Sequence, residues 1–136
     1  MIYAVIDTNV FVSAYITHND ASATPKVVNL MFSGKIKPLY NEEIMAEYRE
    51  VLSREHFHIS EDKRNTLLNY IYKHGILAER TTFDELFIDE SDRVFYEVTL
   101  SEDGSFLVTG NLKHYPIDPR VVTPAQMLQI IESQPN

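Results

Sequence analysis

The chain has 136 residues, 44% of them hydrophobic and 24% charged, a size and balance that predict one globular domain over residues 1–136. It contains no cysteine, which excludes a disulfide framework, a thiolate zinc site and a thiol nucleophile. The net charge of −8 excludes a general basic coat for nucleic acid, although metal ions and a local basic rim could still bind one. No stretch approaches the roughly 18–20 apolar residues of a membrane span, and Asp7 interrupts the N-terminal apolar run, so we expect a cytoplasmic protein without a signal peptide.

The first forty residues alternate apolar runs with helical patterns. In chain order they predict a strand over 2–6, a helix over 9–16, a polar loop over 18–23, a helix from Thr24-Pro25 to Gly34, and a strand over 36–40. A hydroxyl residue followed by proline is a typical helix start, and glycine is a typical helix stop. Because Pro38 lacks a backbone N–H, we expect its strand at an edge of the sheet.

The rest of the chain continues the same alternation. In chain order it predicts a helix from Asn41 to about Arg54, a helix from Ser60 to His74-Gly75, an ambiguous segment over 76–87 with one short strand, a helix opened by Ser91-Asp92, strands over 105–109 and 120–122, and a helix after Thr123-Pro124. Strands that alternate with helices indicate an α/β fold, with a central, mostly parallel sheet of about four to five strands flanked by helices.

Three acidic side chains lie beside apolar segments of the sequence. Asp7 directly follows the first predicted strand, Glu47 shares or borders the apolar face of its helix, and Asp92 opens another helix. A carboxylate beside a core is unfavourable unless it is hydrogen-bonded, paired or bound to a cation. Ligands of parallel sheets bind beyond the carboxyl ends of the strands, which is where these residues are expected to converge. The pattern predicts a divalent-metal site.

Each acid also has a structural explanation. Asp7 and Asp92 are good helix caps, and Glu47 could extend past its apolar stripe or pair with a lysine or arginine. Asp89 could join a cation site from three residues upstream or be a solvated loop acid. These alternatives stay open for each residue taken alone.

Taken together, the segments around these acids form a pattern that spans nearly the whole chain. The segments are Ile6–Ser13, Ala46–Ser53, Asp89–Phe95 and Leu107–Asn111. In this order they resemble the PIN domain family, and most closely the toxins of bacterial toxin–antitoxin systems, the VapC-like ribonucleases. The resemblance implies a PIN-like α/β domain.

The resemblance also implies an activity, a cofactor and partners. It implies an endoribonuclease that hydrolyses RNA phosphodiester bonds with one or two Mg²⁺ or Mn²⁺ ions, a cognate antitoxin protein, a homodimer and no membrane association. Matched position by position, the implied catalytic and metal-binding acids are Asp7, Glu47 and Asp92, the fourth metal ligand is Asn111, and the neighbouring polar or substrate-facing residues are Asn9, Thr109, Lys113 and His114.

The sequence departs from this pattern after the Thr-Gly pair. Many relatives have an aspartate where this chain has Asn111, and often a further acid where it has His114. Asparagine can bind a metal through its carbonyl but adds no negative charge. One alternative is therefore a non-catalytic binding module with an incomplete metal site. Another is a haloacid-dehalogenase-like phosphatase with Asp7 as nucleophile, which is disfavoured because Asn9 stands where that chemistry needs a second acid.

Overall fold

A computed structural model describes residues 1–134, which form a single α/β domain around a five-stranded, all-parallel sheet of order β3-β2-β1-β4-β5. The strands are β1 Ile2–Ile6, β2 Ile36–Tyr40, β3 Ile76–Leu77, β4 Phe106–Val108 and β5 Val121–Val122. The helices are α1 Thr8–Ile16, α2 Ala23–Phe32, α3 Glu42–Leu52, α4 Glu61–His74, α5 Arg93–Leu100 and α6 Pro124–Glu132, with short 3-10 turns at η1 Glu55–Phe57, η2 Glu90–Asp92 and η3 Leu112–His114. The predicted fold class is confirmed.

The strand order changes direction at the middle of the sheet. From β1 the chain first builds outward through β2 and β3, and it then returns to add β4 and β5 on the other side of β1. The connections after β1 and β4 therefore diverge above the carboxyl ends of these two strands. In parallel sheets such a switch point is where ligands bind.

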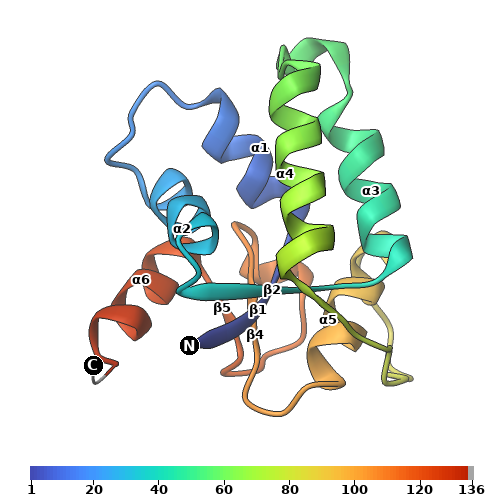
Figure 1. Cartoon of the computed structure of the whole chain (residues 1–136). Helices are drawn as coiled ribbons and strands as arrows, with labels where there is room; N and C mark the ends of the chain where they lie inside the picture. The colour runs from blue at the N-terminus through green and yellow to red at the C-terminus, as the bar shows by residue number, and fades with distance from the viewer. Residues whose placement is uncertain (135–136) are drawn as a thin grey trace.

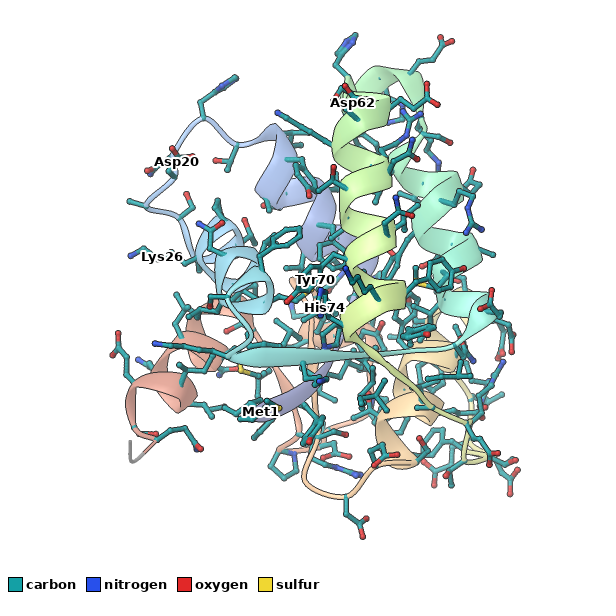
Figure 2. All side chains as sticks on the ribbon, in the orientation of Figure 1. Met1, Asp20, Lys26, Asp62, Tyr70 and His74 are labelled. Carbon is teal, nitrogen blue, oxygen red and sulfur yellow. The ribbon has the colours of Figure 1, made fainter. Side chains whose placement is uncertain are left out.

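The helices cover the sheet as the alternating pattern predicts. In Figure 1, α3 and α4 rise side by side on one side of the sheet, and α5 lies on the other side. Tyr70, labelled on α4 in Figure 2, donates its hydroxyl to the carbonyl of Met31 at the end of α2, at 2.8 Å. None of the helices formed by residues 1–134 is long and apolar enough to cross a membrane.

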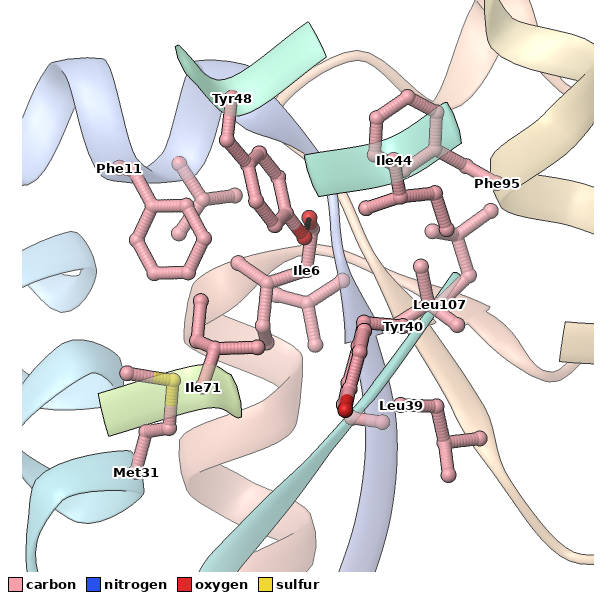
Figure 3. Close-up of a cluster of buried hydrophobic side chains, with 14 of the residues drawn as sticks. Ile6, Phe11, Met31, Leu39, Tyr40, Ile44, Tyr48, Ile71, Phe95 and Leu107 are labelled. Carbon is pink, nitrogen blue, oxygen red and sulfur yellow. Dashed lines mark hydrogen bonds between the residues drawn. The ribbon is translucent and has the colours of Figure 1, made fainter. Parts of the chain in front are cut away.

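The core under α3 is built from large side chains of several elements. Figure 3 shows Tyr48 of α3 beside Phe11 of α1 and above Ile6 of β1. The rings of Tyr48 and Phe11 meet edge to face at 5.1 Å, and all three residues are buried. The Tyr48 hydroxyl donates to the carbonyl of Ile6. This bond stabilises the backbone immediately before Asp7.

The expectation that residues 36–40 form an edge strand is wrong, because β2 lies between β1 and β3. Pro38 is nevertheless tolerated for a local reason. It pairs with Ala4 of β1, whereas β3 is so short that it pairs only with Leu39 and Tyr40. No third strand therefore runs alongside the proline itself.

Three predicted helix caps are confirmed, one lacks its side-chain hydrogen bond, and one helix start is shifted. The side chains of Asn41, Ser60 and Thr123 accept hydrogen bonds from the first turns of α3, α4 and α6. Asp92 occupies the N-cap position of α5 but makes no side-chain capping bond, while the side chain of Asp89 accepts from the Ser91 backbone at the start of η2. The start of α2 is shifted to Ala23, and the Thr24 hydroxyl bonds to Ser13 of α1 at 3.0 Å.

Candidate active site

Asp7 lies at the switch point, one residue past the end of β1. Its side chain is buried, and Oδ2 accepts hydrogen bonds from Thr109 Oγ1 at 2.8 Å, Tyr115 OH at 2.9 Å and Asn9 Nδ2 at 3.2 Å. Asp7 occupies the N-cap position of α1, but its side chain makes no capping hydrogen bond. Its position as a helix cap therefore does not by itself account for the buried carboxylate.

Asn9 and Thr109 join the ends of β1 and β4 across the switch point. Asn9 Oδ1 accepts from the backbone N–H of Gly110 at 2.9 Å, while its amide donates to Asp7. A Cβ at position 110 would lie 3.2 Å from Asn9 Oδ1, so glycine permits this close approach. Thr109 Oγ1 also accepts from the backbone N–H of Asn111 at 3.1 Å. The predicted polar neighbours of Asp7 thus hold its carboxylate in place.

Glu47 is half-buried on α3, and its Oε2 accepts from Thr8 Oγ1 at 2.7 Å. Burial raises the pKa of Glu47, and the negative charges of Asp7 and Asp89 raise it further. Among residues 1–134, no ion pair of Glu47 with a lysine or arginine is found. Within residues 1–134, Glu47 is therefore not explained by pairing with a cation, and the charges near it are those of other acids.

Asp92 stands at the end of η2 with its side chain 14% exposed. Its Oδ2 is buried and has no hydrogen-bond partner among the described residues. His114 Nδ1 lies 3.2 Å from this oxygen but is not directed as a hydrogen bond. Burial, and then the charges of Asp7 and Asp89, raise the pKa of Asp92 to about 6, while His114 opposes the shift.

The remaining predicted residues follow β4. Asn111 is half-buried and directly precedes η3, and Lys113 is exposed on that turn. His114 is brought beside Asp92, whereas the structure gives Lys113 no contact with the acids. Asp118 is not a substitute acid for the site, because it is engaged by Arg120 at 3.0 Å and by the Tyr96 hydroxyl at 2.8 Å.

Two arginines near the acids stabilise a loop. Arg93 donates to the carbonyls of Phe83 and Glu85 and to Glu90, and Arg80 pairs with the buried Glu97 at 2.8 Å. These bonds hold the segment that leads into Asp89 and Asp92. Arg93 is therefore committed to the loop rather than free to bind phosphate.

The oxygen atoms of these acids are the kind of ligand that a hard divalent cation prefers. Neighbouring acids raise the pKa of Glu47 and of Asp92, and within residues 1–134 the buried Asp92 Oδ2 accepts no hydrogen bond, so carboxylates gather here with few donors to balance them. Within residues 1–134, however, no three histidine, aspartate or glutamate side chains form a group that could hold a metal ion by themselves. Mg²⁺ is often bound through only one or two carboxylates and keeps several waters, which fits this looser set.

Sequence reasoning missed two residues that contact the acids, Tyr115 and Thr8. Burial and the neighbouring carboxylates raise the pKa of Tyr115 far above its ordinary value, so its hydroxyl stays protonated and donates to Asp7. In the sequence Tyr115 is one of eight tyrosines spaced like core residues. Only its position just after the Asn111 segment could have drawn attention to it.

Comparison with known proteins gives one family match. A family model described as PIN domain matches residues 3–113, which include Asp7, Glu47, Asp92 and Asn111. No curated protein matches the chain.

Proposed function

Because the chain belongs to the PIN domain family, whose members are generally nucleases, we propose that it is a cytoplasmic endoribonuclease dependent on Mg²⁺ or Mn²⁺. The observation that carries the proposal is the buried Asp92 Oδ2, which accepts no hydrogen bond within residues 1–134 and lies near Asp7 at the β1–β4 switch point. A buried anionic oxygen without a donor is costly to keep. A cation that binds there would balance the charge.

Different side chains would bind the metal ion and accept the proton. Asp7 and Asp92 would hold one ion through carboxylate oxygens, with Glu47 and the Asn111 carbonyl completing the set directly or through water. A bound divalent cation makes water more acidic and neutralises charge on phosphate oxygens. Thr8 occupies only Oε2 of Glu47, so Oε1, on a carboxyl whose pKa is raised, is suited to accept a proton from the attacking water.

The substrate and partners belong to the same proposal. RNA would approach the acids past η3, where the ammonium group of Lys113 and the imidazole ring of His114 are available to contact its phosphates. If the protein is the toxin of a toxin–antitoxin pair, its antitoxin would place a basic side chain among the acids, since such a group balances the same charge as a cation. A homodimer is part of this proposal.

A second candidate is a PIN-fold binding module without catalysis. Asn111 favours it, because it brings no charge where many relatives have an acid, and so does the lack of a three-ligand metal group among residues 1–134. The phosphatase hypothesis is not carried further, because the PIN match accounts for the acids and Asp7 Oδ2 is already occupied by three donors.

Cleavage of a fluorescently labelled single-stranded RNA tests the proposal. Wild-type protein should cut the RNA with Mn²⁺ or Mg²⁺ and should stop in EDTA, while Asp7→Asn should lose most of the activity. Asp20→Asn is the matched control, because Asp20 is exposed on the loop before α2 (Figure 2). Cleavage that continues in EDTA, or that Asp7→Asn leaves unchanged, would exclude this site as its source. Metal binding without cleavage would favour the binding module.

A further inference from the structure

We propose that Tyr115 positions the Asp7 carboxylate for a divalent cation, an inference that rests on the proposed function. Tyr115 lies beyond the residues that the PIN model matches, in the segment between η3 and β5. Its hydroxyl donates to Asp7 Oδ2 at 2.9 Å, across 108 positions of sequence. Both side chains are buried.

The side-chain hydrogen bonds to Asp7 all point to one side of its carboxylate. Tyr115, Thr109 and Asn9 all donate to the same oxygen of Asp7, Oδ2. Among residues 1–134, no side chain that donates to Oδ1 is found. Three side-chain donors on one oxygen fix the rotation of the carboxylate. This arrangement holds a binding group in a set orientation.

The Tyr115 ring is held in place by aromatic packing. Its ring meets Phe87 edge to face at 6.0 Å, and the guanidinium of Arg93 lies 4.9 Å from the centre of the Phe87 ring. Arg93 in turn donates to the carbonyls of Phe83 and Glu85, in the loop that leads to Asp92. Tyr115 therefore connects Asp7, at the end of β1, with the loop that places Asp92.

The ring and the hydroxyl of Tyr115 have different roles. Packing against Phe87 needs only an aromatic ring, which phenylalanine would supply equally well. The hydroxyl adds a donor to a buried carboxylate that already has two side-chain donors. Removing a partner that orients a metal-binding carboxylate typically weakens metal affinity about 10- to 100-fold. Tyr115→Phe therefore isolates the positioning role.

Tyr96 provides a matched control in the same aromatic cluster. It is 5% exposed, against 6% for Tyr115, and its hydroxyl donates to Asp118 instead of Asp7. Binding of Mn²⁺ would be measured by electron paramagnetic resonance on the folded proteins, with circular dichroism confirming the fold. We expect Tyr115→Phe to raise the Kd for Mn²⁺ about tenfold or more. Tyr96→Phe should leave the Kd within about twofold of wild type, since the Tyr96 hydroxyl donates to Asp118, which lies outside the proposed metal-binding set.

Each other result would overturn the inference. An unchanged Kd in Tyr115→Phe would remove the positioning role and leave the proposed function standing. Equal weakening in both variants would show a general effect of the cluster on the fold. Loss of the fold in Tyr115→Phe while Tyr96→Phe folds would show that the hydroxyl supports the structure instead of the cation. Wild-type protein that binds no Mn²⁺ would overturn the proposed metal dependence together with this role.

Discussion

Replacing Asp92 by asparagine should stabilise the protein when no metal is bound. In the folded chain the pKa of Asp92 is raised from 3.8 to about 6, first by burial and then by the charges of Asp7 and Asp89. Each pKa unit corresponds to about 1.4 kcal/mol, so the ionised carboxylate lowers the free energy of unfolding by at most about 3 kcal/mol at pH 7. Because the shift is shared with the neighbouring acids, we expect a gain of about 1–3 kcal/mol.

The sign of the pH dependence follows from the raised pKa. Between about pH 4 and pH 6 the folded chain holds a proton on Asp92 that the unfolded chain has lost, so this group favours the folded state at low pH. Its destabilising effect appears as the pH rises through that window and is complete above about pH 6. The difference in stability between Asp92→Asn and wild type should therefore be small near pH 4 and largest at neutral pH.

Thermal unfolding in EDTA and in Mn²⁺ measures both effects. In EDTA at pH 7 the melting temperature of Asp92→Asn should exceed that of wild type by about 5–10 °C. In Mn²⁺ the wild type should gain about 2.7 kcal/mol at a hundredfold excess over Kd, whereas Asp92→Asn should gain far less. Asp20→Asn, the exposed control, should follow wild type in both conditions. A variant less stable than wild type in EDTA at pH 7 would refute the reasoning, because it would show that Asp92 is already compensated.

Three further substitutions test separate parts of the structure. Asn111→Asp should lower the Kd for Mn²⁺, measured by isothermal titration calorimetry, and should lower the melting temperature in EDTA, since it adds charge to an acidic site; unchanged values would place Asn111 outside the site. Thr8→Val removes the donor to Glu47 and should cost about 1–2 kcal/mol in urea unfolding, and no loss would show that water replaces the hydroxyl. Thr123→Ala removes the capping box of α6 and should cost about 1 kcal/mol in the same assay, while leaving Mn²⁺ binding at the wild-type value.

Much of the fold was predictable because it depends on neighbours in the sequence. The alternation of strands and helices gave the α/β class, and the capping residues Asn41, Ser60 and Thr123 marked helix starts correctly. A cap bonds to a backbone N–H two or three positions away, so local sequence is enough to identify it. Around Asp92 the local sequence indicated the N-cap position of α5, but not that the Asp89 side chain would accept from the Ser91 backbone at the start of η2.

The sequence also identified the acids as unusual but not what surrounds them. Asp7, Glu47 and Asp92 stood out because each interrupts or borders an apolar pattern, and the structure gives each a perturbed pKa. Whether they cap helices, pair with cations or repel one another was open. The sequence predicted that they converge, but only the folded chain shows their partners and leaves Asp92 Oδ2 without a hydrogen-bond donor among residues 1–134.

The sequence by itself determined the fold class, most helix boundaries and the positions of the candidate acids, because these follow from periodicity and from contacts within a few residues. The tertiary structure decided the strand order, the place of Pro38 inside the sheet, and the partners of Asp7. Thr109 and Tyr115 reach that carboxylate from more than a hundred positions away. No local pattern encodes such contacts, because they depend on which strand lies beside β1 after the chain has closed around its core.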